Sequence, residues 1–192
     1  MYPEPVRQFS VWFEQARRDE PSDHDAVSLA SVNPDGRPSI RMVLMRAYDE
    51  RGFVFYTNLA SSKAQDFSAN RFAAMCFHWK STARQVRIEG AVEPVSISEA
   101  DDYFNGRPAE SQIGAWASKQ SQILDCRETL ENRFAEFEQK FSTGTISRPD
   151  FWSGFRLVPD TFEFWDKRVF RLHDRTLYTQ NAQGWTTRKL YP

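Results

Sequence analysis

The feature that most constrains the fold of this chain is a series of short strand patterns joined by tight turns. Turn sequences rich in Asn, Asp and Gly occur at 33–36, 49–52 and 181–184, and each lies between runs typical of β-strands. Segments with helical spacing interrupt these runs instead of alternating with them, which argues against a parallel, doubly wound sheet. The order predicts an antiparallel barrel or sheet with helices packed outside, a mainly β member of the α+β class.

Two kinds of hydrophobic spacing distinguish the predicted helices from the predicted strands. Val6, Phe9 and Phe13 recur at helical spacing, whereas Val86 and Ile88 alternate with charged residues as in a half-buried strand. We expect helices at 4–18, 61–70, 98–105, 109–118 and 122–141. We expect strands at 26–32, 37–47, 53–57, 72–79, 84–95, 153–158, 161–165, 169–173, 176–180 and 184–190. The apolar stripe of the last helix consists of Leu124, Leu130, Phe134, Phe137 and Phe141.

The chain length of 192 residues favours one domain, which can bury a core without disulfides or metal. We therefore expect a single domain over 1–192. Its parts are an N-terminal helix within 1–20, barrel strands over 26–95, a helical segment over 96–141 and C-terminal strands over 150–192.

Charge and composition argue against several classes of partner. Lys and Arg number 25 and Asp and Glu number 26, so the net charge of −1 gives no support for non-specific binding to nucleic acid or membrane surfaces. No apolar run has the length of a membrane helix, and the first ten residues lack the apolar core of a signal peptide. Cys76 and Cys126 are two lone cysteines, which we interpret as thiols in a reducing cytoplasm. Aromatic residues make up 15% of the chain, enough for a core, a subunit interface or the walls of a site for a flat ligand.

Common catalytic signatures are missing from the sequence. There is no GxSxG, HExxH, GxxxxGK[ST] or GxGxxG motif. His24, His78 and His173 are scattered without the spacing of metal ligands, so we expect no metal site. A metal hydrolase or a P-loop enzyme is therefore disfavoured.

Cationic side chains at strand and helix ends indicate a site for anions. Arg41 and Arg46 lie five residues apart, on opposite faces of an ideal strand, although a twist could bring both to one ligand. The sequence SerSerLys at 61–63 falls where a helix begins, and hydroxyls, a lysine and free N–H groups there suit a phosphate. A merely capped helix would look the same.

The segment 171–175 carries the densest group of candidate residues. Arg171, His173 and Arg175 alternate, so we expect all three to project from one face of a strand, with Asp174 pointing the other way. Two guanidinium groups on one face need solvent or an anion. The alternative is an exposed basic edge strand that prevents aggregation.

Several segments together resemble a known family. The resemblance rests on TyrThrAsn at 56–58, ArgGlnValArgIleGlu at 84–89, TyrPheAsnGlyArgPro at 103–108, SerGlnIleGlyAlaTrpAlaSerLysGlnSer at 111–121, PheTrpSerGlyPheArg at 151–156, GluPheTrp at 163–165 and ArgLeuHisAspArg at 171–175. In order and spacing, the chain from about residue 26 onward resembles the pyridoxamine (pyridoxine) 5′-phosphate oxidase family, FMN enzymes of the last step to pyridoxal 5′-phosphate.

The resemblance implies a split β-barrel homodimer with two FMN sites at the subunit interface. The implied holders of the FMN phosphate are Arg41, Lys63 and Ser121. The implied contacts of the ribityl chain and isoalloxazine are Met42, Val43 and Leu44 through their backbone, with Tyr56, Thr57, Gln85, Gln120, Trp165 and Arg175. The substrate phosphate would be held by Tyr103, Arg107 and Ser111, and Arg46 would lie near both ligands. Arg171 and His173 would face the pyridine ring as the catalytic pair.

The implied reaction is transfer of a hydride from the substrate's C4′ carbon to the flavin, which O₂ reoxidises with release of H₂O₂. Two departures from the family pattern bear on ligand binding. Arg46 stands where lysine is usual, and Ser62 stands where arginine is usual. A hydroxyl replaces a hydrogen bond but not a charge, so we expect weaker or more pH-tolerant FMN binding from Ser62.

Two alternatives stay open at this point. The chain could be a split-barrel flavin oxidase acting on another aromatic compound, such as a phenazine precursor, although the segment 103–111 supplies a phosphate clamp that such a substrate would not use. It could instead be a non-catalytic protein that binds FMN or pyridoxal phosphate. Separately from its function, a monomer with a Phe-rich core stays open as the alternative to the homodimer. We expect a small-molecule substrate and no nucleic acid or membrane partner.

Overall fold

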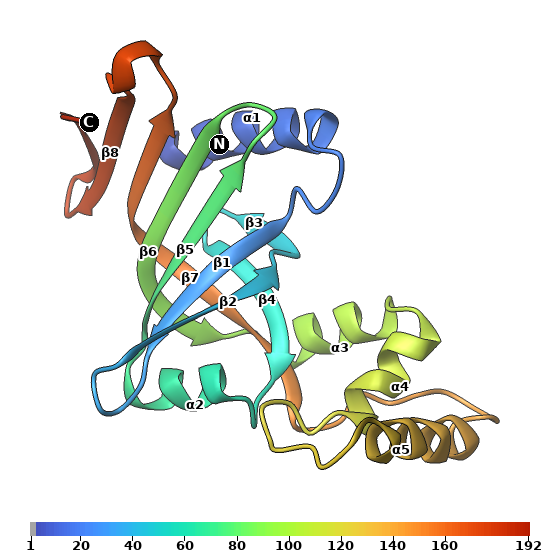
Figure 1. Ribbon diagram of the computed structural model, residues 1–192. Helices are drawn as coiled ribbons and strands as arrows, with labels where there is room; N and C mark the ends of the chain where they lie inside the picture. Colours follow the sequence, from blue (N-terminus) through green and yellow to red (C-terminus); the bar gives the residue numbers. More distant parts are fainter. Residues whose placement is uncertain (1–2) are drawn as a thin grey trace.

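One nine-stranded antiparallel sheet, curled into an open barrel, dominates the computed structural model, which describes residues 3–192 (Figure 1). The main path of the sheet runs β2-β1-β5-β6-β7-β4-β3, and β8 pairs with β7 and with β9. The strands are β1 (Ala26–Val32), β2 (Pro38–Leu44), β3 (Ala47–Asp49), β4 (Gly52–Asn58), β5 (Phe72–Trp79), β6 (Arg84–Pro94), β7 (Trp152–Asp166), β8 (Asp174–Asn181) and β9 (Gly184–Leu190). This arrangement confirms the predicted mainly β, antiparallel fold.

Five α-helices surround the sheet. They are α1 (Glu4–Asp19), α2 (Ser62–Ala69), α3 (Ile97–Asn105), α4 (Ala109–Ala117) and α5 (Arg127–Lys140). Figure 1 shows α1 across one end of the barrel, whereas α3, α4 and α5 form a cluster at the other end. Among residues 3–192, no helix is both long and apolar enough to cross a membrane. The assignment of the chain to one domain stays a prediction.

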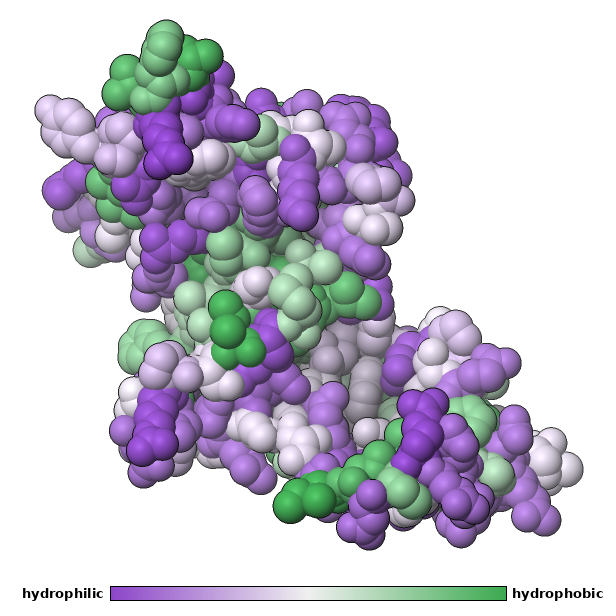
Figure 2. All heavy atoms as spheres, in the orientation of Figure 1, coloured by the Kyte–Doolittle hydropathy of each residue, from purple (hydrophilic) through white to green (hydrophobic). Residues whose placement is uncertain are grey.

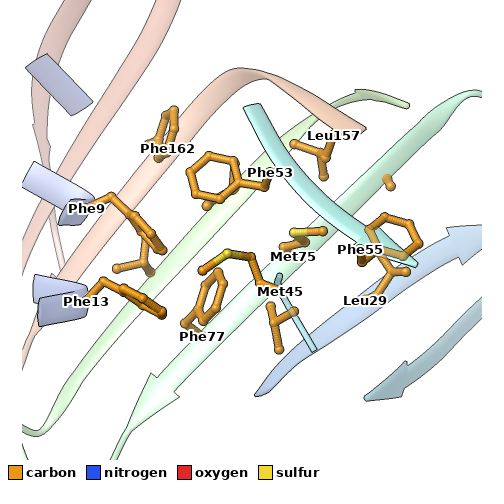
Figure 3. Packing of buried hydrophobic residues seen from close by; sticks show 14 of the residues in the cluster. Phe9, Phe13, Leu29, Met45, Phe53, Phe55, Met75, Phe77, Leu157 and Phe162 are labelled. Carbon is orange, nitrogen blue, oxygen red and sulfur yellow. The ribbon is translucent and has the colours of Figure 1, made fainter. Parts of the chain in front are cut away.

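The main core lies where α1 closes the barrel (Figure 3). The ring of Phe9 is fully buried and lies 4.8 Å from the ring of Phe53 and 5.2 Å from that of Phe77, both in edge-to-face geometry. Burying one such side chain stabilises the fold by about 1.5–3 kcal/mol. The helical stripe predicted at the N-terminus is therefore confirmed as a core-facing surface.

The strand predicted over 37–47 is wrong in one respect, because the structure divides it in two. Met45 and Arg46 stand between β2 and β3. The Met45 amide donates to the Asp25 carbonyl over 2.9 Å, and the Arg46 amide donates to the Val54 carbonyl over 2.8 Å. These bonds turn the chain from the edge beside β1 to the edge beside β4, so the two arginines of this segment do not obey the alternation of one strand.

The helix predicted over 122–141 begins later than expected. The structure forms α5 only from Arg127, after Cys126 in an extended conformation with φ of −153°. Leu124, which fits the helical spacing, lies outside the helix and is 47% exposed. Apolar spacing alone could not distinguish a last loop residue from a first helical one.

The two strands predicted over 153–158 and 161–165 form the single strand β7. Its pairing with β6 continues past Pro159 because a register shift between Glu89 and Gly90 absorbs the irregularity. A proline lacks the N–H that would donate a hydrogen bond in a regular ladder. At a bulge one residue is left unpaired, so no donor is needed there.

The outward side of β2, β1 and β5 carries an exposed apolar surface, which we call the outer sheet face. Ile40, Met42 and Phe72 are 70%, 61% and 63% exposed on it. Figure 2 shows this apolar area in the middle of the molecule, surrounded by hydrophilic residues. An apolar patch with a polar rim is typical of a surface that binds another protein.

Candidate active site

A cavity of about 900 Å³ opens between the sheet and the helices at the far end of the barrel from α1. Residues of β2, β4, α2 and the α3–α4 segment form its walls. Of the residues predicted for the site, it is lined by Arg41, Met42, Val43, Leu44, Arg46, Tyr56, Thr57, Lys63, Tyr103, Arg107, Ser111, Gln120 and Ser121. Residues from four distant parts of the sequence therefore meet at one concave surface.

Lys63 is the most deeply buried cation of the cavity wall, at 8% exposure. Its Nζ donates to the Thr57 hydroxyl over 3.1 Å and to the Gln120 side-chain oxygen over 3.2 Å. No carboxylate lies within ion-pair distance of it in the part of the chain described. Burial, followed by the nearby Arg41 charge, lowers the pKa of Lys63. The Asp66 carboxylate opposes this effect from beyond ion-pair distance. An ammonium group whose direct partners are neutral oxygens keeps positive charge available for an anion.

The N-terminus of α2 adds donors beside Lys63. The helix begins at Ser62, and the side chain of Ser61 makes no capping hydrogen bond. The first-turn amides of a helix have no partner within the helix, and its dipole favours negative charge there. Ser62 itself lines the cavity.

Arg41 faces the same region but carries its own counter-charge. Its guanidinium donates to the hydroxyls of Ser31 and Ser39, each over 2.7 Å, and lies 3.7 Å from the carboxylate of Asp66. Burial lowers the pKa of Arg41, and the Asp66 charge opposes that effect. The arginine is thus held in one orientation by groups on two other elements.

Arg46 lines the cavity from the break between β2 and β3. Its guanidinium donates to the Asp25 carboxylate over 3.0 Å. The sequence left open whether Arg41 and Arg46 serve one ligand or two, and the broken strand brings both to the same cavity.

A stack of aromatic rings stands behind the substrate-phosphate residues expected from the sequence. The rings of Tyr56 and Tyr103 are parallel with centroids 3.9 Å apart, and Trp152 lies parallel to Tyr56 at 5.4 Å. The Arg107 guanidinium lies over the Trp152 ring, 4.8 Å from its centroid. Burial is the main cause of the raised pKa of Tyr56. Trp152 lines the cavity and was missed at the sequence level, where its place in the segment 151–156 was the only signal.

Arg171 and His173 do not lie at this cavity. They line a separate hollow of about 630 Å³ with Trp165, His78 and Lys167. Figure 1 shows the connection between β7 and β8, which carries them, at the opposite end of the molecule from α4. Within one protomer, the predicted catalytic pair therefore lies far from the residues predicted to bind the phosphates.

The strand predicted over 169–173 is wrong. Residues Val169–Arg171 form the short 3₁₀ helix η1, in which Phe170 and Arg171 have φ of 56° and 62°. Non-glycine residues rarely adopt this left-handed conformation, and no strand contains it. Arg171, His173 and Arg175 therefore do not share one strand face.

Arg175 is paired, contrary to the expectation of an unneutralised face. On β8, its Nε donates to the buried carboxylate of Glu163 over 2.7 Å. Asp174 pairs instead with Arg168 over 2.6 Å, which confirms that it points elsewhere. Arg175 is aligned across the sheet with Trp165, and Trp165 with Gln85. None of these three residues lines the large cavity.

Cross-strand register also relates these residues to the outer sheet face. Met42 is aligned with Ser28, Ser28 with Cys76, and Cys76 with Arg87. Directly opposed residues share a face, and the next residue on the same side of β6 is Gln85. Gln85, Trp165 and Arg175 therefore lie on the same side of the sheet as the apolar patch.

Comparison with known families identifies two matching regions. Residues 13–141 match the family described as pyridoxamine 5′-phosphate oxidase. Residues 152–192 match the pyridoxine 5′-phosphate oxidase C-terminal dimerisation region.

Curated relatives match over almost the whole chain. The pyridoxine/pyridoxamine 5′-phosphate oxidase of Chelativorans sp. (strain BNC1) is 52% identical over 190 residues, which cover 98% of this chain and 91% of the relative. The protein of the same name from Mesorhizobium japonicum is 53% identical over 190 residues, which cover 98% and 93%.

Solved structures show the same architecture. PhzG from Burkholderia lata 383, in complex with tetrahydrophenazine-1-carboxylic acid, has 31% identity and a TM-score of 0.92 over 98% of this chain and 93% of that chain. A pyridoxamine 5′-phosphate oxidase-related, FMN binding protein from Nostoc punctiforme has 19% identity and a TM-score of 0.79 over the whole of both chains. At that identity, the second likeness shows the fold alone.

Proposed function

Because the chain belongs to the pyridoxamine 5′-phosphate oxidase family, we propose that it oxidises pyridoxamine 5′-phosphate or pyridoxine 5′-phosphate to pyridoxal 5′-phosphate with FMN. Its relatives are oxidoreductases by name. The acceptor in this proposal is O₂, which is reduced to H₂O₂. The alcohol substrate gives the aldehyde directly, whereas the amine gives an imine that water hydrolyses to the aldehyde with release of ammonia. The observation that carries the proposal is a cavity large enough for two flat ligands with separate sets of cations at its wall.

The residues around Lys63 fit the FMN phosphate. A phosphate monoester carries a charge of about −1.5 to −2 at neutral pH. Lys63 has no carboxylate partner in the described chain, and the start of α2 offers amides without a side-chain cap. Arg41 and Ser121 would complete this group, while Tyr56, Thr57, Gln120 and the backbone of 42–44 would contact the rest of the cofactor.

The residues around Arg107 suit a second phosphate. Arg107 is half-buried, lines the cavity and forms no ion pair with any of residues 3–192. Tyr103 and Ser111 line the same side of the cavity. The substrate phosphate is the group in this reaction that would satisfy such a cation, with Arg46 adding a further charge.

A second copy of the chain would bring Arg171 and His173 to the reacting ring. The pair lies far from the cavity within one protomer, and Gln85, Trp165 and Arg175 share the outer sheet face with exposed apolar residues. A two-fold contact through that face would place the same surface of each subunit against the other and complete two equivalent sites. The match to a dimerisation region supports the homodimer.

Each residue group has a separate task in the proposed reaction. Bound FMN would supply the redox chemistry, by accepting a hydride from the C4′ carbon of the substrate and passing the electrons to O₂. Arg171 would hold the pyridine ring and stabilise negative charge that develops on it. His173 would hydrogen-bond a ring substituent. The cavity cations would fix the position of both ligands by their phosphates.

The PhzG structure supports a second candidate, an oxidase of another aromatic compound. The Arg107 group favours the phosphorylated substrate, because a substrate without an anion at that point would leave the half-buried guanidinium of the cavity wall without a counter-charge. The expected location in the cytoplasm stays a prediction.

An absorbance scan of the purified protein, followed by substrate addition, tests the function. We expect a yellow protein whose flavin band bleaches with pyridoxamine 5′-phosphate under argon, and which forms aldehyde and H₂O₂ in air. Turnover of a reduced phenazine precursor instead would favour the second candidate. Binding of FMN without bleaching by either compound would indicate a carrier and contradict both oxidases.

A further inference from the structure

Arg107 is a half-buried cation that no carboxylate neutralises within residues 3–192. Its Nη1 is sealed from solvent and makes no hydrogen bond, and its side chain forms no ion pair with any of residues 3–192. Burial lowers the pKa of Arg107, and the nearby Arg46 charge acts in the same direction. A guanidinium in such surroundings is costly unless a neutral group stabilises it.

The group that stabilises Arg107 is the face of Trp152. The guanidinium carbon lies 4.8 Å from the centroid of the indole ring, and 5.8 Å from the Phe104 ring. Indole has the strongest cation–π attraction among the aromatic side chains. An aromatic face attracts a cation without cancelling its charge, whereas a carboxylate in the same place would occupy its N–H groups.

Trp152 is itself fixed in orientation. Its ring lies parallel to Tyr56 and edge-to-face with Phe104, at centroid distances of 5.4 and 5.2 Å. Its main-chain carbonyl accepts a hydrogen bond from Arg148 Nη1 over 2.7 Å. It is also aligned with Asn58 at the start of the β4–β7 ladder. The indole plane is therefore set by the sheet and by its neighbours, not by the ligand.

We propose that Trp152 is a positioning residue that gives the site its preference for phosphorylated substrates, by holding Arg107 over its indole face with the guanidinium charge uncompensated. This inference rests on the function proposed above. The selected chemistry is a phosphate monoester on a flat ring, in contrast with the same ring carrying a free hydroxyl. Trp152 acts through Arg107, so its loss weakens ligand binding without removing the reacting groups.

The test compares a phosphorylated ligand with its unphosphorylated counterpart, each measured in the variant relative to wild type. The FMN-loaded protein is titrated under argon with pyridoxal 5′-phosphate and with pyridoxal, following the flavin spectrum. For Trp152→Leu we expect affinity for the phosphorylated ligand to fall about tenfold, the size of a partly desolvated cation–π contact. The affinity of this variant for pyridoxal should stay within about twofold of the wild-type value. The affinity of Trp152→Phe for the phosphorylated ligand should fall between those of wild type and the leucine variant. In turnover, KM for pyridoxamine 5′-phosphate should rise more than kcat falls.

Two further variants separate this role from a loss of packing. Trp116→Leu removes an indole from the same hydrophobic cluster but does not touch Arg107, and it should leave the preference unchanged. Arg107→Met should lose the preference, and adding Trp152→Leu to it should cause no further loss of affinity for the phosphorylated ligand.

Equal losses of affinity for both ligands in Trp152→Leu, or additive losses in the double variant, would overturn the proposal. If Trp152→Leu does not fold, the phenylalanine variant decides on the same criterion. A wild-type protein that does not oxidise the phosphorylated substrate would contradict the proposed function instead, a result visible before any variant is made.

Discussion

The cavity beside α2 and the segment around η1 differ in how firmly the contacts of one subunit hold their residues. At the cavity, Lys63 is buried and Arg41 is half-buried, and hydroxyls, an amide and a carboxylate from distant elements hold them. At η1, Phe170 is 89% exposed, and both Phe170 and Arg171 adopt a left-handed backbone. A single subunit thus completes the part suited to phosphates.

In the proposed dimer, this difference indicates which part of the site would depend on assembly. A left-handed conformation costs about 1–2 kcal/mol for each non-glycine residue, so surrounding contacts are needed to retain it. Within one protomer, exposed side chains supply few such contacts at η1. We expect the second subunit to supply them when the site forms.

The strongest test of the comparison removes Arg171. We expect Arg171→Ala to lower kcat by about 10²–10³-fold, because a cation that stabilises developing charge is lost. FMN should remain bound, since the cavity residues are unchanged. Stopped-flow reduction of the flavin by pyridoxamine 5′-phosphate measures the first effect, and the flavin-to-protein absorbance ratio measures the second. Val169→Ala, on the same exposed segment, serves as control. Wild-type turnover in Arg171→Ala would remove the arginine from the mechanism.

Mixing two impaired variants, assayed at a substrate concentration at which each alone turns over slowly, tests whether the two regions act across subunits. Arg107→Met damages the cavity and Arg171→Ala damages the η1 side. After co-refolding in equal amounts, half of the dimers should be mixed, each with one intact site, which restores about a quarter of wild-type activity. If each site lay within one chain, the mixture would stay as inactive as its components.

Lys63→Met tests the cavity beside α2, the region that one subunit holds in place by its own contacts. The variant loses a charged donor from a site built around it, and we expect the FMN dissociation constant to rise about 10–100-fold, as for other hydrogen bonds to charged groups. Fluorescence quenching of FMN by the apoprotein measures the constant. Lys119→Met, an exposed lysine nearby in sequence, is the matched control. An unchanged constant would place the cofactor phosphate elsewhere.

The smallest expected effect comes from Ser62→Arg. A second cation at the start of α2 should lower the FMN dissociation constant by up to about tenfold and make binding more sensitive to salt, because the added charge is partly exposed. The same titration in low and high salt measures both effects. No gain at either ionic strength would show that Ser62 does not face the phosphate.

Sequence reasoning was most successful where local patterns decide structure. The boundaries of β1, β5 and β9 were predicted to the residue, because tight turns and alternation fix them. Arg41 and Arg46 were singled out as cations at the ends of a strand, whereas the residues of 103–111 were found by resemblance. The meeting of the two groups in space depends on the sheet order, which no local pattern contains.

The errors came from long-range constraints. The alternation of Arg171, His173 and Arg175 suggested a strand. The left-handed backbone at η1 interrupts the extended conformation, which resumes only where β8 begins. The counter-charge of Arg175 is Glu163, a residue on a neighbouring strand. Spacing in the sequence could not predict that pairing.

Strand β2 contributes to two surfaces at once. Ile40 and Met42 line the cavity and are also largely exposed on the outer sheet face. In the proposed dimer, one short segment would then border both the cofactor and the neighbouring subunit. Cofactor occupancy would consequently depend on protein concentration: dilution that separates the subunits should release flavin, and excess flavin should hold the subunits together.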